Sequence, residues 1–207
     1  MPSHLPIMLK LSGRRCVIVG GGPVALRRAQ AMLDCDADVT VIAPQIDDAL
    51  AALPDLIVHQ RPYEPGDLAD AVLVVVATDD PAVNDRVARD ADERGVLVNR
   101  ADDPAAGDVA IPAHAHHGPI TLAVYTAGRS ASAAATIRRS LSDQLDPDWP
   151  RLLEAVGLYR EQIQARVADP AERHARLRRL TDADAMAILK AQGVDALHAR
   201  CRAIVQN

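Results

Sequence analysis

Aromatic side chains are nearly absent from the sequence. They make up 2% of its 207 residues, and there is no Phe at all. Apolar residues still make up 49% of the chain, so a core must be built from Ala, Val, Leu and Ile. An excess of positive charge is also lacking: the formal net charge is −5, which argues against a general nucleic-acid-binding surface. The length suffices for one domain, or for one domain with a small appendage.

Cysteines are few, and long apolar runs are missing. Cys16, Cys35 and Cys201 lie far apart and form no C-x-x-C pair. This spacing argues against a disulfide framework or a thiolate zinc site and favours a reducing compartment. No apolar run approaches the roughly 20 residues of a membrane-spanning helix, and residues 1–6 lack the charged start and apolar stretch of a signal peptide. We therefore expect a cytoplasmic protein without a membrane partner.

Three consecutive glycines follow the first strand-like run of the chain. Cys16–Val19 has the apolar, mostly β-branched composition of a buried strand, and an amphipathic helical pattern begins after Gly22. Gly20, Gly22 and Ala25 fit the dinucleotide-binding pattern G-x-G-x-x-A. In this pattern the first glycine permits the turn, the second leaves room for a pyrophosphate, and the N–H groups of the helix start attract the phosphates. A tight turn without a ligand is the alternative interpretation.

A second strand is predicted one helix later, at Val39–Ala43, which gives the spacing of a βαβ unit. Its end lacks the acidic residue that usually binds the ribose hydroxyls, and Pro44 and Gln45 stand there instead. Gln45 can hydrogen-bond a ribose, and no arginine favours a 2′-phosphate, so the pattern favours NAD over NADP. The predicted cofactor-binding residues are Gly20, Gly22, Pro23, Val24, Pro44, Gln45, Thr78, Asp79 and Asn99.

Strands and helices alternate through the first half of the chain. This alternation predicts an α/β fold with a Rossmann-type, doubly wound parallel sheet in an NAD-binding domain over residues 1–111. A short apolar lead-in, Leu5–Leu11, should pack against it. We expect a small central dimerisation region with a long helix at 112–146 and a helical C-terminal domain at 147–207. Short strands at 109–112 and 120–124 are predicted to flank a histidine-rich loop, His114–Pro119.

Polar side chains follow several of the predicted strands. Ligands bind at the carboxyl edge of a parallel sheet, so the glycine turn, Pro44–Gln45, Thr78–Asp80 and Asn99–Asp103 should converge on one cleft. Thr78–Asp80 can equally serve as a helix N-cap, and Asp102–Pro104 as an ordinary turn. The loop histidines admit a metal-binding interpretation, but a solvated loop is favoured because no carboxylate or cysteine stands close by.

The ordered set of these motifs resembles one known family, precorrin-2 dehydrogenase/sirohydrochlorin ferrochelatase. This enzyme finishes siroheme and also forms part of fused siroheme synthases. The resemblance accounts for the missing ribose acid, since the second strand of this family typically ends in Ala-Pro. It extends from His4 to Leu145 and is carried by His4–Ile7, Cys16–Ala25, Val39–Pro44, Ala77–Asp80 with Asn84, and Asn99, Asp102 and Pro104.

The resemblance implies NAD-dependent oxidation of precorrin-2 to sirohydrochlorin, which many family members follow with insertion of Fe²⁺ as a substrate. It also implies a homodimer formed through the region 112–145. It implicates Asp102 in both reactions, where a carboxylate can accept protons and guide the cation as a transient metal ligand. A hydroxyl residue of the segment Thr126–Ser130 should lie near the tetrapyrrole, with Thr126 and Ser130 as the candidates.

The many carboxylates of such a substrate call for arginines near the cleft. The predicted substrate-binding residues are Arg100, Thr126, Gly128, Arg129 and Ser130. Solvated surface arginines are the alternative for each arginine taken singly. Ala131 stands where the family usually has a proline, and some relatives do not chelate, so metal insertion is less supported than dehydrogenation. Two other functions stay open: an NAD-sensing Rossmann regulatory module, and a dehydrogenase of another small substrate.

Overall fold

The computed structural model describes residues 4–206, apart from the side chain of Pro104, and it divides into two compact units. The first unit holds the residues up to Ile111 together with Ala127–Arg129. The second unit holds Pro112–Thr126 and the residues from Ser130 onward. Within the described range, none of the helices combines the length and the hydrophobicity that crossing a membrane requires.

A five-stranded sheet forms the centre of the first unit, in the order β3-β2-β1-β4-β5. Each neighbouring pair is parallel, which confirms the predicted Rossmann-type fold class. All of β4 and the last four residues of β1 are buried, as expected for central strands covered on both faces. The strands are β1 (Arg15–Val19), β2 (Asp38–Ile42), β3 (Ile57–His59), β4 (Leu73–Val76) and β5 (Leu97–Arg100).

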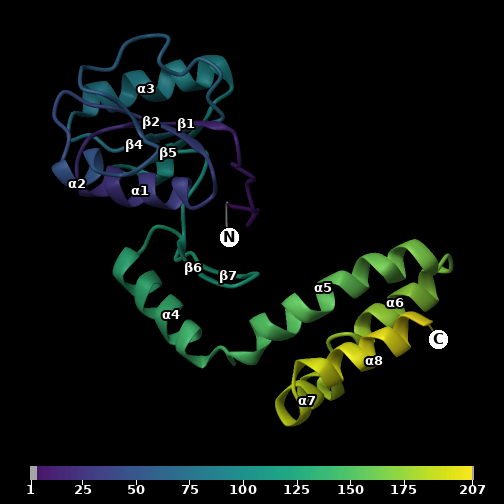
Figure 1. The fold of residues 1–207 in the computed structure, drawn as a ribbon. Coiled ribbons are helices and arrows are strands. Elements are labelled where there is room, and N and C mark those ends of the chain that lie inside the picture. Colours follow the sequence, from purple (N-terminus) through teal and green to yellow (C-terminus); the bar gives the residue numbers. More distant parts are fainter. Residues whose placement is uncertain (1–3, 207) are drawn as a thin grey trace. The chain divides into compact units, whose positions relative to one another are not determined.

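Helices cover the two faces of this sheet. Figure 1 shows α1 (Pro23–Leu33) and α2 (Asp48–Ala51) on one face and α3 (Pro81–Arg94) on the other. Alanines allow the helices to lie close to the strands, since Ala25 of α1 and Ala91 of α3 are fully buried in the two core layers. Small and β-branched side chains thus make up most of this core, which also holds the buried Tyr63. A short 3₁₀ turn, η1 (Pro104–Ala106), follows β5.

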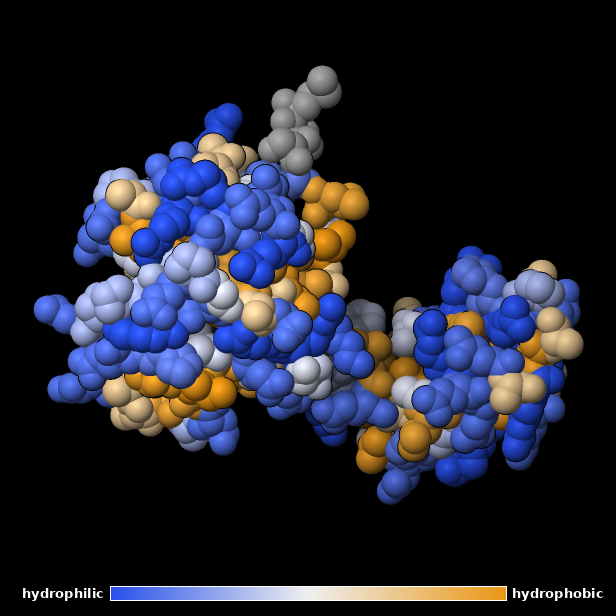
Figure 2. Space-filling model, turned by 90° about the horizontal axis from the view of Figure 1, so that it is seen from above, coloured by the Kyte–Doolittle hydropathy of each residue, from blue (hydrophilic) through white to orange (hydrophobic). Residues whose placement is uncertain are grey.

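The segment before β1 does not pack as predicted. Leu5, Ile7 and Met8 are 81%, 65% and 76% exposed, and only Leu11 joins the core. Residues 4–10 form neither strand nor helix, so no regular backbone pairing holds them on the sheet. Figure 2 shows such apolar groups as separate areas on a largely hydrophilic surface.

The second unit begins with a hairpin whose first strand lies later than predicted. β6 (Ala113–His117) pairs antiparallel with β7 (Ile120–Val124), and His117 lies opposite Ile120. The predicted strand at 109–112 is wrong, and the histidines predicted to form a loop lie in β6. Gly118, with φ +56°, and Pro119 form a two-residue connection, and such a turn places the strand directly before it.

Helices make up the rest of the second unit. α4 (Ala131–Gln144) packs on both strands of the hairpin, and the Ser130 side chain caps it. α5 (Asp148–Arg166), α6 (Pro170–Arg179), α7 (Ala183–Gln192) and α8 (Val194–Gln206) surround a second core, and Figure 1 shows α6 and α8 alongside α5. Its largest fully buried side chains are Leu152, Ile163, Leu189, Leu197 and Ile204. The expected division at residues 146 and 147 stays a prediction.

The separate cores predict separate unfolding transitions. Leu197 is fully buried in the second unit, so Leu197→Ala should lower the free energy of unfolding of that unit by about 2–5 kcal/mol. Trp149, the single tryptophan of the chain, lies in α5 and reports on the same unit by fluorescence during urea unfolding. Leu50→Ala, at a fully buried site of the first unit, is the matched control and should leave this transition in place. Equal shifts in both variants would contradict the expectation.

Candidate active site

Two glycines of the β1–α1 turn are required by close backbone contacts. Gly20 has φ +132°, and a Cβ atom on it would lie 2.2 Å from the carbonyl oxygen of Ala77. A Cβ atom on Gly21 would lie 2.0 Å from the carbonyl oxygen of Gln45. The turn is therefore held against the segments that follow β2 and β4, and neither position accepts a side chain without backbone movement.

Gly22 has the opposite surroundings. A Cβ atom built on Gly22 meets nothing within 4 Å, so this glycine leaves open space rather than relieving a clash within the fold. Gly22 is also the N-cap of α1, where it supplies no capping side chain, and Pro23 follows at the first helical position. The N–H groups of Val24 and Ala25 precede the first intrahelical bond, from Leu26 to Gly22.

The start of α1 thus fits a dinucleotide pyrophosphate. No acidic side chain lies in its first turn, whereas aspartates or a serine cap α2, α3, α4, α6 and α7. Unpaired N–H groups at the positive end of a helix dipole attract an anion. Together with the open space at Gly22, these groups could hold the pyrophosphate of a nicotinamide dinucleotide.

The loop after β2 presents no acidic side chain to a ribose. Pro44 and Gln45 are exposed, as a cofactor contact requires. Asp47, the first acidic residue beyond them, accepts a hydrogen bond from the N–H of Ala49 and caps α2. Its own N–H donates to the carbonyl of Gly21, so Asp47 ties the loop to the glycine turn.

The segment after β4 caps the helix that follows it. Asp80 caps α3 by accepting from the N–H groups of Ala82 and Val83. Thr78 donates from its Oγ1 to Asn84 Oδ1 at 2.6 Å, and its carbonyl accepts from Asn84 Nδ2 at 3.0 Å. Asp79 is exposed beside them. The helix-cap interpretation is confirmed, and cofactor contacts by Thr78 and Asp79 stay predictions.

Asp102 lies in a network of hydrogen bonds after β5. Arg100 donates through Nε to Oδ1 at 2.8 Å and through Nη2 to Oδ2 at 2.7 Å. Asn84 Nδ2 donates to the same Oδ2 at 3.0 Å, and Arg100 Nη1 donates to Asp85 at 3.0 Å. The Arg100 side chain is 8% exposed and that of Asp102 is 31% exposed. Asp102 is thus fixed by two partners but open to a ligand.

This network sets the charge of Asp102. The hydrogen bonds from Arg100, with a smaller contribution from Asn84, hold the pKa of the Asp102 carboxyl far below its usual range, although partial burial opposes them. The same bonds raise the pKa of Arg100. Asp102 is therefore ionised throughout the physiological range, and a strongly acidic carboxyl is a weak general base. An ionised carboxylate is well suited to stabilising positive charge or attracting a cation.

The structure gives Arg100 a different position from the one expected of a substrate-binding arginine. Its guanidinium is buried and directed at Asp102 and Asp85, within the protein. Direct binding of substrate carboxylates by Arg100 stays a prediction, but the observed contacts instead orient Asp102. Asp85 was missed in the sequence, and Asn84 was seen only as part of a motif. The sequence does indicate that Asn84 is buried, because Asn84 lies on the same face of α3 as Val87 and Ala91.

Asn99 has an unsatisfied buried acceptor. The residue is 5% exposed, and its Nδ2 donates to the carbonyl of Val109 at 2.8 Å. Its Oδ1 is buried and has no hydrogen-bond partner among the described residues. Asn99 pairs with Val75, whose side chain lies in the core layer of α1, whereas Arg100 pairs with Val76 in the layer of α3. A donor group of a ligand would remove the cost of burying Oδ1 unpaired.

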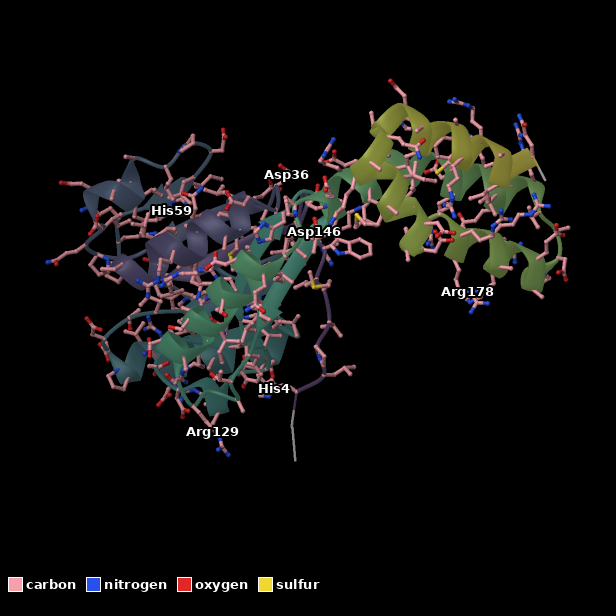
Figure 3. All side chains as sticks on the ribbon, turned by 90° about the horizontal axis from the view of Figure 1, so that it is seen from below. His4, Asp36, His59, Arg129, Asp146 and Arg178 are labelled. Carbon is pink, nitrogen blue, oxygen red and sulfur yellow. The ribbon has the colours of Figure 1, made fainter. Side chains whose placement is uncertain are left out.

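The predicted substrate-binding loop after β7 is closed by its end residues. Thr126 Oγ1 donates to the carbonyl of Ser130 at 3.0 Å, and Ala127 and Gly128 between them have φ +53° and +74°. Ser130 Oγ accepts from the N–H of Ala133 and caps α4. Arg129 is exposed, and Figure 3 shows its side chain projecting away from the ribbon. Tetrapyrrole contacts by these residues stay predictions.

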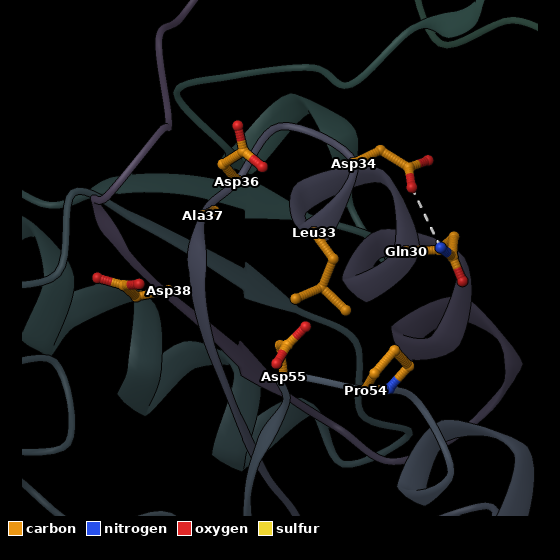
Figure 4. A pocket seen from close by; sticks show the side chains of 8 residues that line it. All are labelled: Gln30, Leu33, Asp34, Asp36, Ala37, Asp38, Pro54 and Asp55. Carbon is orange, nitrogen blue, oxygen red and sulfur yellow. Dashed lines mark hydrogen bonds between the residues drawn. The ribbon is translucent and has the colours of Figure 1, made fainter.

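A surface hollow of about 400 Å³ lies in the first unit, at the edge of the sheet opposite the glycine turn. Its wall includes Asp38, the first residue of β2, so it lies at the amino edge of the sheet and not at the carboxyl edge (Figure 4). It holds several aspartates, but the described residues contain no group of three or more side chains arranged to bind a metal. The lining residues are Gln30, Leu33, Asp34, Asp36, Ala37, Asp38, Pro54 and Asp55.

Comparison with known proteins identifies the family. Residues 7–113 match the family described as "Putative NAD(P)-binding". The chain belongs to this NAD(P)-binding family. The match spans the sheet, the glycine turn and the Asp102 network.

Curated relatives of this NAD(P)-binding chain are named siroheme synthase. The protein of that name from Azotobacter vinelandii is 37% identical over 82% of this chain and 37% of its own length. The one from Chromobacterium violaceum is 38% identical over 79% of this chain and 36% of its own length. The chain thus spans little more than a third of the curated relatives that it matches.

A solved structure described as "SirC, precorrin-2 dehydrogenase" is similar along its whole length. It matches with a TM-score of 0.75 and 27% identity, covering 97% of this chain and 100% of its own. These similarities confirm the family resemblance derived from the sequence motifs.

Cofactor binding at the glycine turn can be tested with one substitution. Gly22→Asp should leave the melting temperature nearly unchanged, because a side chain at Gly22 meets open space. It should abolish NAD⁺ binding, since a carboxylate there adds bulk and like charge to the pyrophosphate site. Calorimetric titration with NAD⁺ measures this, with Gly157→Asp, at another open glycine, as control. Wild-type affinity in Gly22→Asp would contradict the assignment.

The Asp102 network predicts a stability difference that depends on pH. The folded pKa lies below the unfolded value of about 3.9, so the contribution is complete above that value and is lost as pH falls toward the folded pKa. Asp102→Asn should lower the free energy of unfolding by about 2 kcal/mol at neutral pH, and by progressively less below about pH 4. Urea unfolding at stepped pH measures this, and a difference independent of pH would contradict it.

Proposed function

We propose that this chain is an NAD-dependent precorrin-2 dehydrogenase that forms sirohydrochlorin in siroheme biosynthesis. The observation that carries the proposal is the end-to-end similarity to a precorrin-2 dehydrogenase structure, combined with a glycine turn that leaves open space for a dinucleotide. The siroheme synthase names of the curated relatives support the same pathway. Pro44 and Gln45 at the end of β2, with no arginine between them and Asp47, support NAD over NADP.

The reaction removes a hydride and a proton from precorrin-2. NAD⁺, when bound, would accept the hydride, and the proton would pass to water. The residues of the chain bind and orient the reactants and manage the accompanying charge. Val24 and Ala25 offer N–H groups to the pyrophosphate, and Asn99 Oδ1 offers its free lone pair to a cofactor N–H or O–H group. Asp102, held ionised by Arg100 and Asn84, stabilises the positive charge that develops on the macrocycle as the hydride leaves.

The role of Asp102 can be tested by matched aspartate variants. Asp102→Asn removes the charge and should slow dehydrogenation by about 10²–10³-fold, as loss of a preorganised electrostatic group does. Asp103→Asn is the control, because the Asp103 side chain accepts the N–H of Ala105 and, among the described residues, takes no part in the Asp102 network. An anaerobic absorbance assay with precorrin-2 and NAD⁺ measures both rates. A normal rate in Asp102→Asn with an intact fold would remove Asp102 from the mechanism.

The role of Arg100 is to position Asp102. Arg100→Gln should raise the pKa of Asp102 toward its ordinary value and move the acidic limb of the pH–rate profile to higher pH. An arginine that bound substrate carboxylates directly would mainly raise KM instead. Carboxyl ¹³C NMR of Asp102 and the pH dependence of kcat distinguish the two roles.

Insertion of Fe²⁺ into sirohydrochlorin is the second step that the family resemblance suggests. An ionised Asp102 with a partly exposed side chain could attract the cation transiently as it approaches the macrocycle. Addition of Fe²⁺ or Co²⁺ after completed dehydrogenation tests this step separately, because the absorbance of the metallated product differs from that of sirohydrochlorin. A chain that only dehydrogenates would leave the second spectrum unchanged.

A homodimer formed through the region 112–145 is part of the same proposal. Ile137 and Leu141 on α4 are each 46% exposed, and an apolar helix face of this kind favours a partner.

The cytoplasm suits the three unpaired cysteines, which a reducing compartment preserves.

Oligomeric state can be measured by light scattering at micromolar concentration. Wild type should have the mass of a dimer, and Leu141→Asp should have that of a monomer with unchanged helix content. Leu158→Asp is the matched control, because Leu158 on α5 is 67% exposed but lies outside the proposed interface. A monomeric wild type would contradict the dimer.

A further inference from the structure

The histidines of β6 lie on two different faces of the hairpin. His117 directs Nε2 to Ser142 Oγ of α4 at 3.0 Å, so its face packs against that helix. Side chains alternate along a strand, which places His114 and His116 together on the opposite face. Their ring centroids are 5.6 Å apart, with an angle of 62° between the ring planes. Two imidazoles therefore lean toward each other on the face turned away from α4.

Hydrogen bonds fix the chemical state of the His114 ring. His114 Nδ1 lies 3.1 Å from the carbonyl oxygen of Pro112, which can only accept, so Nδ1 carries the proton. Nε2 of the neutral ring is then a bare lone pair. Histidines that bind metals commonly show this arrangement, with one nitrogen bonded to the protein and the other free for the ion.

The ring of His116 is oriented through the same nitrogen, here by a hydroxyl that can donate or accept. Its Nδ1 lies 3.1 Å from the Oγ1 of Thr121, which is the cross-strand partner of His116 in the β6–β7 register. The residue opposite His114 is Ala123, whose small, exposed side chain leaves room beside the pair. The hairpin thus orients both rings through Nδ1, and Ala123 adds little bulk beside them.

We propose that His114 and His116 bind one divalent transition-metal ion through their Nε2 atoms. Imidazole nitrogen suits Fe²⁺, Co²⁺, Ni²⁺, Cu²⁺ and Zn²⁺, whereas Mg²⁺ and Ca²⁺ prefer a set of oxygen ligands such as carboxylates. Metal–nitrogen bonds of about 2.0–2.1 Å place two ring centroids about 5 Å apart, close to the observed spacing. Small rotations of the rings are sufficient to direct both lone pairs at one ion.

The proposed site is open. The described residues contain no third histidine, cysteine or carboxylate arranged to complete it. Water or another small ligand would fill the remaining positions, in contrast to the closed four-ligand sites that stabilise folds. An ion held by two side chains exchanges readily. The site does not depend on the proposed dehydrogenase activity, which needs no metal for the transfer of hydride.

Calorimetric titration of the tag-free chain with NiCl₂ at about pH 7.5 tests the proposal, since imidazole is then mostly neutral. One equivalent of Ni²⁺ should bind, and MgCl₂ should give no binding. His114→Ala and His116→Ala should each weaken Ni²⁺ binding by at least about tenfold. His174→Ala is the matched control, at an exposed histidine of α6, and should bind as wild type does. Absence of binding in wild type, or wild-type affinity in either variant, would overturn the proposal.

Two further measurements separate metal binding from a change of fold. Thr121→Val removes the partner of His116 Nδ1 but no ligand, and should weaken Ni²⁺ binding by about 10-fold or more. In the wild-type chain, imidazole ¹⁵N NMR with Co²⁺ should broaden the signals of His114 and His116 before those of His117 and His174. If the four histidines broaden alike, the rings are simply an edge-to-face pair and the proposal fails. Dehydrogenation without added metal should be unchanged in His114→Ala and His116→Ala. A loss of that activity would bear on the proposed dehydrogenase function and not on metal binding.

Discussion

The nucleotide-binding unit depends on the contact of the β1–α1 turn with the two loops beside it. Gly20 lies against the carbonyl of Ala77, and Gly21 lies against the carbonyl of Gln45, at distances that exclude a side chain. The contact therefore unites the carboxyl ends of β2, β1 and β4 through backbone atoms alone. It also explains why three glycines occur in a row: two serve the fold, and only Gly22 borders open space. The usual explanation of the G-x-G pattern assigns the first glycine to the turn, and here Gly21 shares that task.

Besides the glycine turn, the alternation of side chains at the end of β5 determines the geometry of the site. Asn99 lies in the layer of α1 with an unpaired oxygen, and Arg100 lies in the layer of α3, where it holds Asp102 together with Asn84. A buried arginine needs acidic partners, and Asp85 and Asp102 supply them. The charge that fixes Asp102 in place also keeps it ionised. Arg100 therefore determines both where the Asp102 carboxylate lies and that it is ionised. Such a carboxylate suits the role of a fixed negative charge.

The sequence was sufficient for the sheet and for the position of the glycine turn because both follow from local patterns. Buried parallel strands are apolar throughout, and a glycine turn between strand and helix has a mechanism that can be read from residue types. The prediction for the hairpin is wrong because Gly118 and Pro119 form a two-residue turn and not part of a longer loop. A two-residue turn requires the first strand to end at His117. The apolar run 109–112 donates one backbone hydrogen bond to β5, from the N–H of Val109 to the carbonyl of Val98, but it is not assigned as a strand.

The Asp102 network could not be predicted in the same way. Arg100 was expected to face the substrate, because an arginine at a strand end gives no sign of whether it pairs within the fold. Its partners come from α3 and from the loop after β5, 15 and 2 residues away in the chain. Only the register of β5 against β4 decides which side of the sheet the guanidinium enters. Asn84 showed the one usable signal, since a polar residue on an apolar helix face must find a partner.

The alternation at β5 also limits how this part of the chain can change in length. Adding or deleting a single residue between Gly95 and Arg100 would exchange the two faces, moving the guanidinium into the layer of α1 and the asparagine into that of α3. The Asp102 network and the free oxygen of Asn99 would then be lost together. Insertions of an even number would keep the faces but displace the strand end from the turn at Gly20. Length variation among descendants of this sequence should therefore be excluded from β5 and concentrated in the exposed segments before β1 and around β3.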